Sequence, residues 1–181
     1  MEERLTVLRP AATERVTLRT LGPADADFIL ELLNEPSFLQ HIGDKGVRTV
    51  EAAREYIRTG PMASYERFGF GLYLAESKSA REPMGICGLL KREALKDVDL
   101  GFAFLARFWS MGYAFESALA VLAHARTVLG LERVVAIVSP GNAASIGLLG
   151  KLGFCREGLT RLSQDGPDLE LFGSAPSIRA T

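Results

Sequence analysis

The sequence predicts a mixed α/β fold, in which a largely antiparallel central sheet carries helices on both faces. Short apolar segments bounded by turn residues come first, at about 69–76, 84–91 and 97–105, as expected for strands joined by hairpins. A helix over about 112–129 follows, with its apolar residues on a common face. The segment 132–138 is then almost continuously apolar, which is typical of a central strand covered on both faces. Consecutive strands followed by a strand–helix–strand crossover indicate a mixed sheet.

The segment before these strands is expected to hold a first strand and two helices. Apolar and polar residues alternate around Val16, which indicates a half-exposed strand. Proline and aspartate within 22–25 favour the start of a helix, and the Asn-Glu-Pro sequence at 34–36 favours its end. Thr49 is a typical N-cap residue for a second helix, which we expect to end at the Gly-Pro sequence 60–61.

The C-terminal part is expected to contain one more helix and two strands. Gly130 is a typical terminator for the long helix, and a shorter helix over 142–152 is expected to end at Gly153. Strands are predicted near 155–163 and 167–173.

The chain is expected to form one domain. Its 181 residues, 48% of them hydrophobic, are enough to bury a single substantial core. The sequence has no internal repeat and no linker long enough to divide it. We expect the domain to span 14–174, with tails at 1–13 and 175–181, where little periodicity is present.

Charge and hydropathy argue against several classes of protein. The net charge is −1 with 24% charged residues, so no global field indicates nucleic acid or an anionic membrane as a partner. No apolar run approaches the roughly 18 residues of a membrane span. The N-terminus lacks a basic segment followed by an apolar one, so we expect no secretory signal and a cytoplasmic protein.

The two cysteines, Cys87 and Cys155, lie far apart in apolar, strand-like segments. We interpret both as buried free thiols in a reducing compartment. No cysteine and histidine cluster has metal-ligand spacing, so we expect no metal.

The turn at 107–114 is the strongest candidate for a binding site. It lies where a strand gives way to the long helix, and the first N–H groups of a helix have no partners within the helix. The positive end of the helix dipole is there too, so the turn suits an anion such as a pyrophosphate. Gly112 would let a phosphate approach the main chain without a Cβ in the way.

The sequence of this turn resembles a family. Arg107-x-x-Ser110-x-Gly112-x-Ala114 is similar to the Gln/Arg-x-x-Gly-x-Gly/Ala acetyl-CoA motif of the GNAT N-acetyltransferases. The wider pattern resembles the ribosomal-protein-alanine (RimJ/RimL-type) branch, through Asp99-Leu100-Gly101-Phe102, Trp109, Glu116, Pro140-x-Asn142-x-x-Ser145, Lys151-Leu152-Gly153-Phe154 and the upstream Arg15-Val16-Thr17-Leu18-Arg19. The resemblance covers about 14–173. Ser110 departs from the glycine usual at its position, and serine loses the freedom of a positive φ.

The resemblance implies the GNAT fold, acetyl-CoA as cosubstrate and an amine as acceptor. It also implies that the strand ending at 101–105 pairs with the pantetheine arm through its backbone and separates from the strand 132–138 to admit it. The cofactor-binding residues that it implies are Phe104, Leu105, Arg107, Ser110, Met111, Gly112, Tyr113, Ala114, Asn142 and Ser145.

Two residues are candidates for proton transfer. Many GNAT enzymes place a tyrosine near the thiolate, but Leu149 stands at that position here, so we assign Ser145 as the donor to the leaving thiolate. Asp99 stands at a position that is often acidic in the branch, and it is the candidate base for the amine. The alternative is that Asp99 is a solvated charge at a strand edge. Asn142 is also expected to be a helix N-cap with Ser145 in the first turn.

The predicted activity is direct transfer of an acetyl group from acetyl-CoA to a primary amine. No cysteine or serine with an adjacent histidine lies in the motif region, which argues against a covalent enzyme intermediate. The alternatives are a non-catalytic acyl-CoA-binding regulatory module and a transferase of a longer acyl group. We expect the acceptor to be a small molecule or a protein N-terminus, recognised by residues of about 36–68. The protein is expected to be a monomer or a homodimer.

Overall fold

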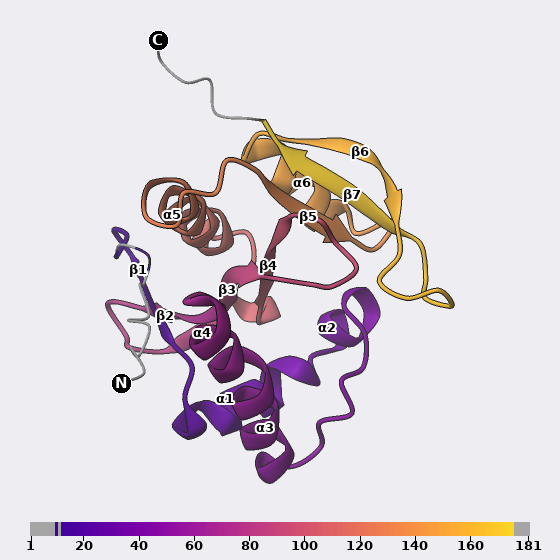
Figure 1. Ribbon diagram of the computed structural model, residues 1–181. Helices are drawn as coiled ribbons and strands as arrows, with labels where there is room; N and C mark the ends of the chain where they lie inside the picture. Colours follow the sequence, from indigo (N-terminus) through magenta and orange to yellow (C-terminus); the bar gives the residue numbers. More distant parts are fainter. Residues whose placement is uncertain (1–9, 11, 176–181) are drawn as a thin grey trace, which may run out of the picture.

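The computed structural model describes residue 10 and residues 12–175, which form a seven-stranded sheet (Figure 1). The strand order is β1-β2-β3-β4-β5-β7-β6, and every neighbouring pair is antiparallel except β4 and β5. The strands are β1 (Val16–Thr20), β2 (Leu72–Ser77), β3 (Pro83–Leu90), β4 (Val98–Phe104), β5 (Val134–Val138), β6 (Phe154–Thr160) and β7 (Leu169–Ser174).

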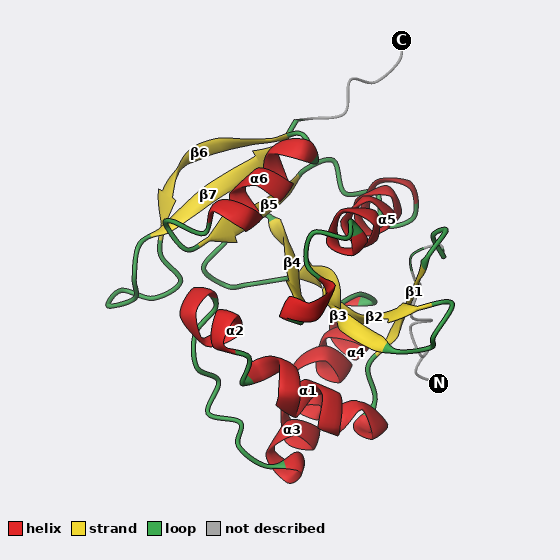
Figure 2. Ribbon diagram, turned by 180° about the vertical axis from the view of Figure 1, so that it is seen from behind, coloured by secondary structure: helices red, strands yellow, loops and turns green. Residues whose placement is uncertain are grey.

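Helices cover both faces of this sheet, as Figure 2 shows from behind. They are α1 (Ala26–Leu33), α2 (Pro36–His41), α3 (Val50–Ile57), α4 (Ala63–Phe68), α5 (Tyr113–Thr127) and α6 (Ala143–Lys151). Two 3₁₀ turns, Pro23–Asp25 and Ala106–Phe108, precede α1 and follow β4. The predicted mixed sheet with helices on both faces is therefore confirmed.

The alternation of side chains along the strands produces two cores. Tyr73 and Leu74 are adjacent on β2, so they point to opposite faces of the sheet. Tyr73 belongs to the core beneath α5 and α6, and Leu74 to the core beneath α1 and α3. β5 contributes buried residues such as Val134 and Ala136, which confirms its interior position.

The structure corrects one predicted helix boundary and adds a helix that the sequence pattern did not predict. The chain does not leave the helix at Gly60-Pro61, because a π-helical turn over Arg58–Met62 leads directly into α4. Pro61 lies inside this π-helical turn, so the proline does not end the helical segment. The Asn-Glu-Pro sequence at 34–36 follows the end of α1 at Leu33, as predicted, but Pro36 also occupies the first position of a further helix, α2.

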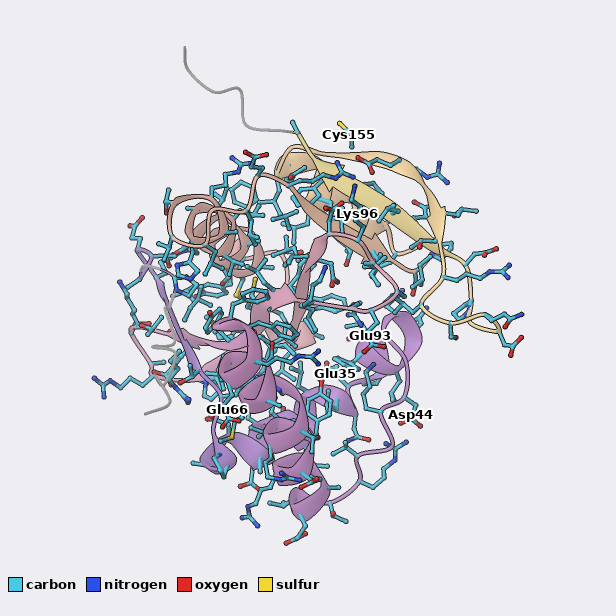
Figure 3. The ribbon with its side chains drawn as sticks, in the orientation of Figure 1. Glu35, Asp44, Glu66, Glu93, Lys96 and Cys155 are labelled. Atoms are coloured by element: carbon cyan, nitrogen blue, oxygen red, sulfur yellow. The ribbon has the colours of Figure 1, made fainter. Side chains whose placement is uncertain are left out.

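The structure also corrects the interpretation of one cysteine. Cys87 is buried, as expected, but Cys155 is exposed. Cys155 lies on β6, the edge strand, and points away from the core while its neighbour Phe154 is buried (Figure 3). The predicted tails fall largely on residues 1–9, 11 and 176–181, which lie outside the described residues.

Candidate functional site

The site begins where the two parallel strands β4 and β5 separate. They are paired only at Val98–Val134 and Asp99–Val135. Past these two rungs, the remainder of β4 to Phe104 and of β5 to Val138 have no strand partner across the gap within the described chain. The expected separation is present as a fork that opens towards the C-terminal ends of both strands.

The backbone of β4 offers polar groups to this fork. Leu105 N–H donates to Met84 O on β3 at 3.0 Å. Since backbone groups alternate between the two sides of an antiparallel strand, Phe102 and Phe104 direct theirs towards the fork. Phe104 O is already used, because Trp109 Nε1 donates to it at 2.8 Å.

This register refines the predicted set of cofactor-binding residues. Phe102 faces the fork through its backbone although it was not among them; the signal that finds it is the strand pairing. Leu105 instead has its N–H bonded to β3 and its side chain fully buried in the core beneath α1 and α3.

The turn after β4 has the shape of an anion cradle. Ser110 has a φ of +60° and Gly112 a φ of +83°, so two of three consecutive residues are left-handed. Gly112 is the N-cap of α5, and the first N–H bond of the helix runs from Glu116 to Gly112 O at 3.0 Å. The N–H groups of Tyr113 and Ala114 therefore have no acceptor within the helix and are available to a bound anion.

The side chain of Arg107 is engaged with carboxylates on other elements. Its Nη1 lies 2.6 Å from Glu31 Oε1, and its Nη2 lies 3.6 Å from Glu82 Oε1. Glu35, at the junction of α1 and α2 (Figure 3), also accepts the N–H of Ala106 at 3.2 Å. Arg107 and Glu35 thus tie the start of the turn to α1, and the groups left for an anion are mainly backbone amides.

A second set of contacts holds the far end of the turn. Arg15 donates from Nε to Glu116 Oε2 at 2.8 Å and from Nη1 to Met111 O at 2.9 Å. Thr13 Oγ1 donates to Glu116 Oε1 at 2.5 Å. Burial raises the pKa of Glu116, but the hydrogen bonds from Thr13 and Arg15 more than offset this, and its pKa is lowered. Arg15 is one of the residues that carry the family resemblance, but the sequence pattern indicates no role for it.

Asp99 lies at the closed end of the fork, on the last rung between β4 and β5. Its side chain is 1% exposed, so it is not a solvated strand-edge charge. Arg92 Nε lies 3.1 Å from Oδ1 and 3.2 Å from Oδ2. Burial raises the pKa of Asp99, and the charge and hydrogen bond of Arg92 offset this only in part.

The start of α6 lies after the open end of β5. Asn142 is its N-cap, and Asn142 Oδ1 accepts the N–H of Ser145 at 3.2 Å, which confirms the predicted cap. Ser145 is half-buried. Leu149, at the position of the usual tyrosine, is fully buried in the core beneath α5 and α6.

Two kinds of feature are absent from the described residues. Over residues 10 and 12–175, no group of three or more His, Cys, Asp or Glu side chains could hold a metal ion. None of the helices in that same part of the chain is both long and apolar enough to cross a membrane.

Comparison with known proteins identifies the family. A family profile described as an acetyltransferase (GNAT) domain matches residues 15–155. An N-acetyltransferase named p20 from Bacillus licheniformis is 30% identical over 153 residues, which cover 82% of this chain and 84% of that protein. The protein YkkB of Bacillus subtilis is 28% identical over 144 residues, covering 78% and 82%.

Solved structures share the fold. An acetyltransferase from Agrobacterium tumefaciens superposes with a TM-score of 0.78 at 22% identity, covering 97% of this chain and 99% of that one. The ribosomal-protein α-N-acetyltransferase RimL in complex with coenzyme A superposes with a TM-score of 0.78 at 18% identity, covering 93% and 98%. The profile spans most of the chain, and the fork and the turn lie within it. The chain therefore belongs to the GNAT acetyltransferase family and is an acetyltransferase enzyme.

Proposed function

We propose that this protein transfers an acetyl group from acetyl-CoA directly to a primary amine. The observation that carries the proposal is that the fork is continuous with the turn at 107–114. β4 forms one side of the fork and leads directly into the turn. An unpaired strand edge followed by a positive-φ turn at a helix N-terminus suits a ligand with an amide-containing arm and a pyrophosphate. Coenzyme A has both.

The residues present fit acetyl-CoA. The N–H groups of Tyr113 and Ala114 bind the pyrophosphate, together with the backbone of 110–112. The free backbone groups of Phe102 and Phe104 pair with the pantetheine amides in the way that a neighbouring strand would. Asn142 and Ser145 close the site from the side of α6.

Acetyl-CoA supplies the acetyl thioester, and the side chains of this chain move the protons. Asp99 accepts a proton from the amine, directly or through water, because its raised pKa makes it a stronger base than an ordinary aspartate. The amine nitrogen forms its bond to the carbonyl carbon, and the carbon–sulfur bond breaks. Ser145 donates a proton to the departing thiolate. A backbone N–H of β4 stabilises the charge on the carbonyl oxygen.

The acceptor that suits this site best is an amine of low basicity. A peptide α-amine has a pKa of roughly 7.7–8.0, against about 10.4 for lysine, so a larger fraction is neutral at pH 7. A single buried carboxylate that is already paired with Arg92 is then a sufficient base. RimL, which shares the fold, is by its name an α-N-acetyltransferase of a ribosomal protein. We therefore propose a peptide or protein N-terminus as the first class to test.

The experiment is a screen of thiol release from acetyl-CoA, with N-terminal peptides, polyamines, amino acids and amino sugars as acceptors. We expect at least one α-amine to stimulate release above the hydrolytic background, and a thioester with a longer acyl group to be used less well. Tight binding of acetyl-CoA in calorimetry without stimulated release would instead favour a non-catalytic acyl-CoA-binding regulatory module. Faster release from butyryl-CoA than from acetyl-CoA would favour the longer acyl group.

A further inference from the structure

We propose that Arg15 is a positioning residue for the pyrophosphate of acetyl-CoA, because it sets the orientation of the Met111–Gly112 peptide in the anion-binding turn. The inference rests on the proposed function, since it concerns the same cofactor. It adds a residue about 100 positions away in the sequence that the motif of the turn does not contain.

The contacts of Arg15 converge on this turn from several directions. Its Nη1 donates to Met111 O at 2.9 Å, and its Nε and its backbone N–H donate to the two oxygens of Glu116 at 2.8 and 2.7 Å. Its guanidinium also lies over the ring of Tyr113, 4.7 Å from the centroid. Arg15 therefore contacts Met111 in the anion-binding turn and both Tyr113 and Glu116 in the first turn of α5.

The bond to Met111 O has a consequence for the amide of Gly112. The Met111–Gly112 peptide is trans, as are all peptides of the described chain. In a trans peptide the C=O and the following N–H point in opposite directions. Because Arg15 holds the carbonyl on its own side, the N–H of Gly112 faces away from Arg15. That side is free to receive an anion together with the N–H groups of Tyr113 and Ala114.

The guanidinium of Arg15 lies close to Gly112. A Cβ built on Gly112 would lie 3.1 Å from Arg15 Nη2. The guanidinium thus occupies the space beside the glycine. The absence of a Cβ at Gly112 leaves room for the Arg15 side chain as well as for a bound phosphate. A positive φ of +83° puts a further constraint on the same residue.

Backbone hydrogen bonding beside the sheet keeps Arg15, the residue before β1, in place. The carbonyl oxygen of Arg15 accepts the N–H of Lys78, which directly follows β2, at 2.9 Å. Glu116 is in turn held by Thr13. The turn is consequently braced against β1 and β2 at one end and, through Arg107, against α1 at the other. Lysine cannot replace this geometry, because one ammonium on a flexible chain does not match the separate Nε and Nη1 bonds.

The test compares a ligand that has the pyrophosphate with one that lacks it. Arg15→Ala and Arg15→Lys are measured with acetyl-CoA and with S-acetylpantetheine, using the best acceptor amine. The control is Arg161→Ala, which removes an exposed ion pair with Asp168 between β6 and β7. We expect Arg15→Ala to raise the KM for acetyl-CoA about tenfold at unchanged kcat, and Arg15→Lys to restore only part of this. The KM for S-acetylpantetheine should stay that of the wild type.

A second variant keeps the proposal testable if Arg15→Ala does not fold. Glu116→Gln removes the charge that orients Arg15 while keeping the shape of the side chain. We expect it to act in the same direction, raising the KM for acetyl-CoA at unchanged kcat. Where Arg15→Ala does fold, the double variant should be no worse than Arg15→Ala alone, because the two residues act as one unit.

Each outcome has a definite meaning. An Arg15→Ala protein with a wild-type KM for acetyl-CoA overturns the inference alone. Equal losses for acetyl-CoA and S-acetylpantetheine also overturn it, since they indicate general loosening of the fold. A wild-type protein that does not bind acetyl-CoA at all overturns both the inference and the proposed function.

Discussion

At the scale of single residues, the most unusual backbone in the site belongs to Ser110. Its φ of +60° is a conformation that side chains with a Cβ rarely adopt, and it costs about 1–2 kcal/mol relative to the right-handed region. The family motif has glycine at this position, so the shape of the turn is retained here at the expense of strain. That retention is itself an argument that the shape of the turn has a function.

Ser110→Gly should therefore stabilise the protein. Glycine has a larger conformational entropy in the unfolded chain, which costs about 0.5–1 kcal/mol of stability and opposes the relief of strain. We therefore expect the free energy of unfolding to rise by about 0.5–1 kcal/mol. Urea denaturation measures it. Ser110→Ala is the control, because it keeps the Cβ and should give no gain. If both variants gained equally, strain at this φ would not be the cause.

Asp99 is the residue whose ionisation should shape the pH profile. Its pKa is raised mainly by burial, so it becomes a competent base only above an ordinary aspartate's range. Between that pKa and the pKa of the acceptor, about 7.7–8.0 for an α-amine, the amine is protonated and Asp99 is ionised. The rate ratio of wild type to Asp99→Asn should be largest in this window and fall at higher pH. A ratio independent of pH would leave Asp99 a structural partner of Arg92.

Ser145 can be tested separately from binding. If its hydroxyl donates to the thiolate, Ser145→Ala should lower kcat by roughly tenfold or more while the affinity for CoA changes little. Ser145→Thr keeps a hydroxyl and should retain more activity. Should Ser145→Ala show wild-type kcat, solvent would be the proton source and Ser145 only a residue of the first turn of α6.

At the scale of elements, we expect the N-terminus of α5 to be the part on which the proposed binding of acetyl-CoA depends most. Its first N–H groups are uncapped by any side chain, and Gly112 provides the left-handed entry to the helix. Thr49 and Asn142 each cap a helix by accepting a backbone N–H, whereas no side chain does so for α5. The donors at the start of α5 are therefore not used by a side-chain cap.

Gly112→Val should accordingly weaken binding of CoA about tenfold or more, as measured by calorimetry. A β-branched residue is strained at a φ of +83°, and its Cβ would press on Arg15. Gly46→Val is a matched control, since Gly46 also has a positive φ but lies in the exposed loop before α3 with open space around its Cβ position. A similar loss of CoA binding in both would point to general destabilisation.

At the scale of the whole molecule, a partly buried ion pair connects the sheet to the helices beneath it. Arg19 on β1 donates to both oxygens of Asp25, at 2.8 and 3.0 Å, and Gly22 N–H donates to Oδ2 at 2.9 Å. Burial raises the pKa of Asp25, but Arg19 and Gly22 more than offset this, so its pKa is lowered on folding.

Asp25→Asn should cost about 2 kcal/mol of stability at pH 7, the loss of charge-assisted hydrogen bonds at a buried site. Because the folded pKa is lowered, the contribution is fully present above the unfolded pKa of about 3.9 and is lost as the pH falls through the folded pKa. Denaturation at pH 7 and at pH 2 should show the difference shrinking. Asp44→Asn, in an exposed pair with Arg48, is the control and should change little at either pH.

Local patterns were sufficient for much of the fold. The periodicity of 112–129 and 132–138 predicted α5 and β5, and Thr49 and Asn142 were identified as N-caps from residue type alone. The sequence pattern missed a helix that begins at Pro36 and placed a helix end at Pro61, where the helical segment continues. Pro36 occupies a first turn, where its missing N–H is harmless, and Pro61 lies in a π-helical turn, so neither proline marks the end of helical structure.

The sequence by itself determined the order and type of most elements and located the turn at 107–114, because these depend on neighbours within a few positions. Only the tertiary structure decided which distant side chains complete that turn. Arg15 contacts Met111 and Glu116, which lie about 100 residues away in the sequence, and Arg107 pairs with Glu31 on α1. It also decided that Asp99 is buried against Arg92 at the end of a fork. Such pairings depend on strand register and helix placement, which no local pattern of residues encodes.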